Sequence, residues 1–168
     1  MELLKEVILR PELSPQAEPR RPQCFLWMDM ESVQHFSAHP LSLHPVTTPE
    51  QEETLRKVRI EAEVPSGNAS HEVWYLATVG NQPVGVVGIV EFETQQGRIG
   101  RLQDICISPR FQGLGYGNLL LSAACRVSQR IGLDALVIVT DPDGWARHWC
   151  IRRGFKELEV ANSATRSN

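Results

Sequence analysis

The sequence predicts one α/β domain built on a mixed, mostly antiparallel sheet with a single parallel pair of strands. Two observations predict it: three apolar segments are separated by short turns, and a long helical pattern lies between two strands. Short turns make neighbouring strands antiparallel, whereas a helical crossover makes them parallel. The length of 168 residues, with 42% hydrophobic and 22% charged residues, is typical of one globular domain.

Residues 1–40 are interpreted as an N-terminal extension, and residues 41–168 as the domain itself. Cys24–Met28 is expected to be a strand, and Met30–Phe36 a short helix. Four prolines prevent regular structure in the preceding segment; they are Pro11, Pro15, Pro19 and Pro22. The extension is expected to pack on the domain, form a subunit contact or cover part of the acceptor site.

The domain is predicted to open with a strand over Leu41–Val46 and a helix that follows it. Thr48 has the position of a helix N-cap, Pro49 suits the first turn, and Gln51 stands three residues after the cap. The segment Val64–Gly67 ends this helix.

Three strands follow as an antiparallel meander, and a helix then leads to a fourth strand. Apolar residues at three- and four-residue intervals predict the helix over Asn118–Ile131, with Gly132 at its C-terminal cap. The strand after it, Leu133–Val139, is apolar throughout and is expected to run parallel to the strand before the helix. The meander strands are Trp74–Val79, Val84–Phe92 and Ile99–Ile107.

A glycine-rich turn between the third meander strand and the helix carries the strongest functional signal. Gly113, Gly115 and Gly117 leave the backbone without side chains where the helix begins, and exposed amides at a helix N-terminus favour a phosphate or pyrophosphate. The spacing does not fit G-x-G-x-x-G, and no Gly-Lys-Ser/Thr follows, so the two common nucleotide motifs are excluded. An ordinary glycine-rich connection is the competing interpretation.

The segment Gln112–Gly117 resembles the Q/R-x-x-G-x-G/A loop of the GNAT superfamily of N-acetyltransferases. Ile105–Phe111 is similar to the strand end that leads into that loop. The resemblance implies the GNAT fold, with the two parallel strands splayed apart at one end and acetyl-CoA lying in the opening. The residues expected to bind this co-substrate are Ile105, Cys106, Ile107, Gln112, Gly113, Leu114, Gly115, Tyr116, Gly117 and Asn118.

A second motif, over 141–155, resembles the closing signature N-x-x-A-x-x-L-Y-x-x-x-G-F of the same family. Asp141 or Asp143 is expected to cap its helix, and Gly154 to end it before a last strand begins at Phe155. The D-x-D-x-W and R-R-G-F elements are similar to a branch of GNAT proteins whose substrates are mostly unassigned. The two motifs cover about half of the chain.

Cys150 stands where the family usually has the tyrosine that protonates the departing thiolate. Three interpretations are open: Cys150 is the general acid, a water or another residue replaces it, or the chain does not catalyse. Covalent chemistry at Cys150 is a fourth, for which the sequence places no suitable histidine beside it.

Three carboxylates are candidates for the base that deprotonates the amine: Asp104, Glu91 and Glu93. Strand alternation puts Asp104 on one face with Leu102 and Cys106, and puts Gln103, Ile105 and Ile107 on the other. As an alternative, Asp104 serves only as a cap or in a salt bridge.

The predicted function is transfer of an acetyl group from acetyl-CoA to a primary amine of a small molecule or peptide; the alternative is a non-catalytic acyl-CoA-binding module. A net charge of −3 argues against nucleic-acid binding, and no membrane contact is expected. The four scattered cysteines and the absence of a signal peptide favour the cytoplasm. A homodimer is expected from the resemblance. No metal is expected, because three histidines lack carboxylate or cysteine partners in register; they are His35, His39 and His44.

Overall fold

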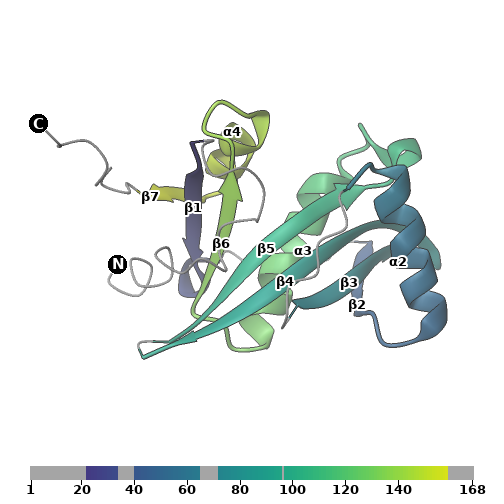
Figure 1. The fold of residues 1–168 in the computed structure, drawn as a ribbon, viewed down its shortest axis with the longest axis horizontal. Helices are drawn as coiled ribbons and strands as arrows, with labels where there is room; N and C mark the ends of the chain where they lie inside the picture. Colours follow the sequence, from purple (N-terminus) through teal and green to yellow (C-terminus); the bar gives the residue numbers. More distant parts are fainter. Residues whose placement is uncertain (1–21, 34–39, 65–71, 96, 159–168) are drawn as a thin grey trace, which may run out of the picture.

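The computed structural model describes residues 22–33, 40–64, 72–95 and 97–158, and its centre is a seven-stranded sheet. The strand order is β2-β3-β4-β5-β6-β1-β7 (Figure 1). The strands are β1 (Cys24–Asp29), β2 (Leu41–Pro45), β3 (Glu72–Val79), β4 (Gln82–Thr94), β5 (Gly97–Ile107), β6 (Ala135–Thr140) and β7 (Lys156–Leu158). The helices are α2 (Pro49–Glu61), α3 (Tyr116–Arg130) and α4 (Trp145–Arg152), with short 3-10 turns η2 (Met30–Ser32) and η3 (Pro109–Phe111).

The sheet is mixed, and only β5 and β6 are parallel. The strands from β2 to β5 form antiparallel neighbours, which confirms the meander. The parallel pairing covers Ile99–Leu102 of β5 and Ala135–Ile138 of β6, and it stops there although β5 continues to Ile107. Figure 1 shows the two strands pointing apart beyond this point. The predicted parallel pair and its separation at one end are both present.

The expected strand near the N-terminus is part of the sheet. β1 lies between β6 and β7 and runs antiparallel to both. The segment interpreted as an extension therefore supplies a strand to the domain. Of the helix expected over Met30–Phe36, the structure describes the 3-10 turn Met30–Ser32, and the positions from 34 to 39 lie outside the described residues.

Two helices cover opposite faces of the sheet (Figure 1). α3 buries Leu120 and Ala124 completely against one face, together with residues such as Val87 and Ile89 of β4. α2 buries Leu55 and Val58 against the other face, over Leu76 and Val86. At the common value of about 25 cal/mol per Å² of buried apolar surface, such contacts dominate the stability of the domain. We call the two sides the α3 face and the α2 face.

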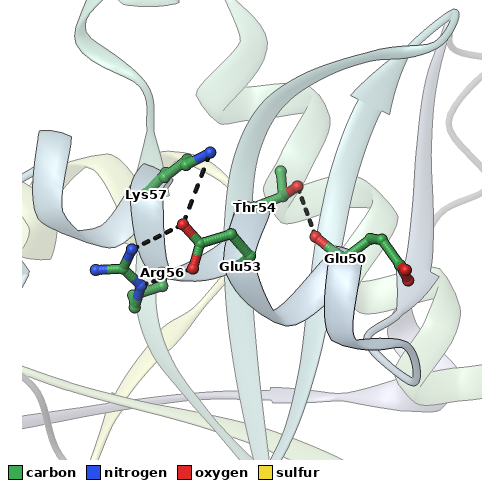
Figure 2. A network of polar contacts seen from close by, with 5 residues as sticks. All are labelled: Glu50, Glu53, Thr54, Arg56 and Lys57. Carbon is green, nitrogen blue, oxygen red and sulfur yellow. Dashed lines mark hydrogen bonds and ion pairs between the residues drawn. The ribbon is translucent and has the colours of Figure 1, made fainter.

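α2 begins as its sequence predicts, and its outer surface is occupied by charged side chains. Thr48 caps the helix through the Gln51 N–H, and the Gln51 side chain accepts from the Thr48 N–H at 3.1 Å. On the exposed surface, Glu53 lies 2.7 Å from Arg56 and 3.7 Å from Lys57 (Figure 2). These ion pairs are exposed to solvent, and the buried side of α2 is formed by Leu55 and Val58.

Two helix starts differ from the sequence predictions. α3 begins at Tyr116, two residues before the predicted Asn118, because the backbone turns into the helix directly after Gly115. α4 has Gly144 as its N-cap with no side-chain hydrogen bond, so neither predicted aspartate caps it. Asp141 instead accepts from the Asp143 N–H at 2.9 Å and closes the turn before the helix.

Candidate active site

The glycine loop presents bare backbone at the N-terminus of α3. Gly113 and Gly115 have φ angles of +77° and +85°, which side chains with a Cβ rarely adopt. A Cβ added at either position would meet no atom within 4 Å, so the backbone conformation requires glycine there and packing does not. The Gln112 side chain donates to the Ile107 carbonyl at 3.0 Å and holds the loop against the end of β5.

The first turn of α3 suits an anion. No side chain caps this 15-residue helix, and its first turn contains no acidic residue. The first amides of a helix lack intrahelical acceptors and carry the positive end of the helix dipole. Asn118 is fixed by α4, since its Oδ1 accepts from the Trp149 indole N–H at 2.7 Å. An uncapped helix start without acidic residues, preceded by a glycine-rich loop, is the arrangement that favours anions at helix N-termini.

A β-bulge interrupts β5 where it leaves β6. Val86 and Gly88 of β4 pair with Cys106 and Gln103, so two residues of β5 face one residue of β4. Asp104, within the bulge, has a φ of +51°, a left-handed conformation that aspartate tolerates better than most residues. None of the residues 103–107 pairs with β6, although Gln103, Cys106 and Ile107 keep their partners on β4.

The bulge overturns the predicted alternation along β5. Leu102 packs on the α3 face, whereas Asp104 contacts α2 and Cys106 packs among residues under α2. Gln103, expected on the opposite face from Asp104, also lies on the α2 face, where its side-chain amide donates to Glu72. Strict alternation assumes an uninterrupted ladder, and the extra residue of a bulge reverses the faces beyond it. Ile105 and Ile107 pack against the α3-face core.

Five polar residues gather on the α2 face beside the bulge, and we call them the α2-face cluster. Asp104 Oδ2 lies 3.7 Å from the Arg59 guanidinium of α2, which in turn lies 4.4 Å above the Trp74 ring. Gly88 makes room for this arrangement, since a Cβ there would lie 2.7 Å from Glu72 Oε1. The cluster consists of Arg59, Glu72, Arg101, Gln103 and Asp104.

Burial sets the electrostatics of this cluster. It raises the pKa of Asp104, and the nearby Arg59 and Arg101 oppose that shift. It lowers the pKa of Arg101, against the attraction of Asp104 and Glu72. A half-buried carboxyl with a raised pKa accepts a proton more readily at neutral pH than an exposed one, which suits a general base.

The other two predicted carboxylates lie away from the bulge. Glu91 forms an ion pair of 2.6 Å with Arg98, whose other nitrogen donates to the Ile131 carbonyl at the end of α3. The glycine loop is at the opposite end of this helix, about 22 Å away at 1.5 Å per residue. Glu93 is exposed and pairs in register with Arg98. Of the three candidates, only Asp104 lies where β5 and β6 separate.

Cys150 is buried in the core and keeps only 1% of its surface exposed. It packs with the residues of the α3 face, next to Cys125 and Phe155 in the same cluster. Burial, reinforced by the Cys24 thiol, raises the pKa of Cys150 to about 11. An ordinary thiol has a pKa of about 8.5, so proton transfer from Cys150 to a thiolate of that basicity would be unfavourable. Its predicted role as general acid finds no support in this placement.

Sequence reasoning missed most of the α2-face cluster. Arg101 carried a usable signal, because it is a charged residue flanked by Ile99, Gly100 and Leu102 in a predicted central strand. Glu72, Gln103 and Arg59 carried none, since Glu72 is a polar residue at a strand end, Gln103 is one polar residue within a strand, and Arg59 is one of several charges on a solvated helix. Their meeting depends on how α2 crosses the sheet.

In the part of the chain that the structure describes, neither a metal site nor a membrane-spanning helix is found. No three histidine, cysteine or acidic side chains come close enough there to hold a metal ion. No helix within those residues has the length and apolar character needed to cross a membrane.

Comparison with known proteins identifies the family. Residues 27–160 match the family model described as "Acetyltransferase (GNAT) family". The chain belongs to the GNAT acetyltransferases. The match begins inside β1 and ends beyond β7, so it takes in the whole sheet apart from the first residues of β1. Membership of this family supports acyl transfer as the class of reaction. No curated protein matches the chain.

Solved structures share the GNAT fold at low sequence identity. A GCN5-related N-acetyltransferase from Kribbella flavida has a TM-score of 0.57 and 16% identity, covering 82% of this chain and 55% of its own. A functionally unknown protein from Staphylococcus epidermidis has a TM-score of 0.54 and 13% identity, with coverages of 81% and 57%. The chain thus spans just over half the length of these two proteins.

A third structure is covered almost completely. An aminoglycoside acetyltransferase from an uncultured soil metagenomic sample, in complex with sisomicin, has a TM-score of 0.57 and 14% identity. The match covers 76% of this chain and 97% of that one. At these identities the likeness establishes the fold alone.

Proposed function

We propose that this GNAT protein transfers an acetyl group from acetyl-CoA directly to the primary amine of a small molecule. One observation carries the proposal: the uncapped, glycine-lined N-terminus of α3 follows, after a short turn, the half of β5 that no longer pairs with β6. The first feature suits a pyrophosphate, and the second offers unpaired backbone to an extended amide-containing chain. Coenzyme A combines these two chemical features in one molecule.

Asp104 is the base in this proposal. It faces α2 at the bulge, within the half of β5 that does not pair with β6, and its pKa is raised by burial. The amine nitrogen attacks the thioester carbonyl and its proton passes to Asp104, directly or through one water. A backbone N–H of 103–107 that has no partner on β6 stabilises the oxyanion.

The thiolate that leaves takes its proton from water, because the thiol of Cys150 is buried and has a pKa of about 11. Holding both reactants in an aligned geometry is worth up to about 7–11 kcal/mol, so a dedicated acid is dispensable. The reaction needs no metal. The expected cytoplasmic location and the homodimer remain predictions.

Calorimetry and turnover test the two halves of the proposal. Acetyl-CoA is expected to bind the purified protein, and Gly115→Ala to weaken binding because alanine resists a φ of +85°. With an amine that is acetylated, Asp104→Asn should lower kcat/KM by about 10²- to 10⁴-fold without changing acetyl-CoA affinity. Glu91→Gln and Glu93→Gln should retain activity. Loss of activity in these two and not in Asp104→Asn would assign the base to the other end of the sheet.

A second function, a non-catalytic acyl-CoA-binding module, is favoured by one observation. The position at which the family usually has a tyrosine holds a thiol that the core buries. Such a module would bind acetyl-CoA in calorimetry and release no coenzyme A with any amine. Turnover that survives Cys150→Ala would exclude it and would also remove Cys150 from the mechanism.

A further inference from the structure

Arg101 is a buried cation without a hydrogen-bonding partner in the described part of the chain. Only 9% of its surface is exposed, and its Nε atom is buried with no hydrogen bond. No ion pair or hydrogen bond connects it to any described residue, although Asp104 and Glu72 are close enough to attract it. Arginine stays charged under these conditions, because its guanidinium does not lose a proton in proteins.

This placement has a cost that packing alone does not explain. A buried charge without hydrogen bonds is strongly unfavourable, and apolar replacements at such positions are often neutral or stabilising. The neighbours of Arg101 show that an apolar residue would fit: Val90 and Val137 pair with it on either side, and Ile99 precedes it on the same face. Arg101 thus has both these apolar residues and the carboxylates of Asp104 and Glu72 as neighbours, and its unpaired Nε points to a ligand with an oxygen acceptor.

The position of Arg101 connects that ligand to the proposed reaction. Arg101 belongs to the next-to-last β5–β6 pair before the two strands separate at Leu102 and Ile138. It interacts electrostatically with Asp104, the proposed base. A molecule whose amine lies beside Asp104 therefore has Arg101 within reach of a second group.

We propose that Arg101 binds a carboxylate of the acceptor, so that the acceptor is a small amino acid-like amine. This inference rests on the proposed acetyl transfer and names its substrate class. A guanidinium matches a carboxylate in a planar two-bonded arrangement, which lysine does not reproduce. The ligand supplies the hydrogen bond that the buried Arg101 Nε lacks in the protein.

Charge balance favours a carboxylate over a phosphate. The α2-face cluster contains two cations, Arg59 and Arg101, and two carboxylates, Glu72 and Asp104. An amino acid that enters as a zwitterion adds no net charge to this balanced set. A phosphate dianion would add negative charge beside two carboxylates that are already partly desolvated.

Matched pairs of acceptors test the proposal. The twenty common L-amino acids and their carboxamides are compared by coenzyme A release, with aminomethylphosphonate as a phosphate-like probe. The wild-type protein should prefer acids to the matching amides by about 10- to 100-fold in kcat/KM, the effect of hydrogen bonds to a charged group. Equal use of acids and amides, or a preference for the phosphonate, would overturn the inference.

Variants of Arg101 test whether this residue causes the preference for acids over amides. Arg101→Gln should raise KM for the acid about 10- to 100-fold and leave KM for the amide and the acetyl-CoA affinity unchanged. Arg101→Lys should retain part of the preference for acids, because lysine keeps the positive charge but cannot make the planar two-bonded contact with a carboxylate. Arg101→Met checks the fold, and its melting temperature should equal or exceed that of the wild type. Arg56→Gln, on the exposed surface of α2, is the matched arginine control and should change none of these quantities.

Calorimetry distinguishes a missing carboxylate site from a missing acetyl transfer. Should no amine be acetylated, binding of the amino acids and amides to the coenzyme A complex is measured by calorimetry. Binding of acids only, lost in Arg101→Gln, supports the carboxylate site without catalysis. An equal loss of acids and amides in Arg101→Gln would make Arg101 a structural residue and overturn its assignment.

Discussion

The two halves of β5 are similar in length but differ in pairing: one has a neighbouring strand on both sides, and the other on one side only. Gly97–Leu102 is paired with β4 on one side, and Ile99–Leu102 also pairs with β6 on the other. Gln103–Ile107 keeps β4 but has no pairing with β6, and it contains the bulge and the left-handed Asp104. Residues of the first half are mostly buried, and those of the second are half-buried.

This difference shows how one strand serves both stability and binding. The first half is hydrogen-bonded to β4 and to β6, which fixes its position in the sheet. The second half is therefore anchored where it joins the first half and along β4. Its other edge then keeps backbone groups available for a ligand, as an exposed sheet edge does in peptide recognition. Arg101 and Asp104 stand on either side of the boundary, which is why the proposed carboxylate site and base share one location.

Shortening one apolar side chain in each half should give the largest contrast. Leu102→Ala is expected to lower the free energy of unfolding by about 2–5 kcal/mol, because Leu102 is 3% exposed in the main core. Ile105→Ala should cost clearly less, since Ile105 is only half-buried at the edge of that core. Urea unfolding of both variants measures the difference. Similar losses would mean that the second half is as tightly packed as the first.

Most of the scaffold was predictable from the sequence because it rests on local signals. The capped start of α2, the short turns of the meander and the glycines at Gly132 and Gly154 each determine their own surroundings. The glycine loop was predictable for the same reason, since its conformation depends on its own glycines and needs no distant partner. These features led to the family that the comparison then identified.

The α2-face cluster was not predictable in this way, because it joins three separate segments of the chain. Arg59 comes from α2, Glu72 from the start of β3, and the other members from β5. The bulge at Asp104 then reversed the expected faces, and nothing in the sequence around it marks an extra residue. The burial of Cys150 likewise depends on how α4 packs on the α3 face.

A smaller effect is expected from the charge of Asp104. Burial raises its pKa from an ordinary value of 3.8, against the attraction of Arg59 and Arg101. The folded state therefore holds this proton more strongly than the unfolded state. The stability that results is fully present below pH 3.8 and is lost as the pH rises through the higher folded pKa. Cys106 also faces Asp104, but its pKa of about 11 keeps it uncharged in this range.

Asp104→Asn imitates the protonated acid, so it should isolate the contribution of the Asp104 charge to the stability of the protein. The stability of the variant relative to the wild type is expected to increase from pH 3.5 to pH 7 and then to remain constant. Urea unfolding at a series of pH values measures it, and the subtraction removes the titration of all groups that the two proteins share. A relative stability that instead decreased with pH would mean that Arg59 and Arg101 outweigh burial, and that Asp104 is a structural ion-pair partner.

The smallest effect is expected on the outer surface of α2, where charges are as numerous as in the α2-face cluster but fully hydrated. Glu53 contacts Arg56 and Lys57 there, and its pKa is lowered chiefly by the hydrogen bonds from Arg56 (Figure 2). Exposed pairs gain little, because water screens them and both side chains lose freedom. Glu53→Gln should leave the urea midpoint, acetyl-CoA affinity and acceptor preference unchanged within error. A measurable change in acceptor preference would show that the position of α2, and with it that of Arg59, responds to the ion pairs on the outer surface of the helix.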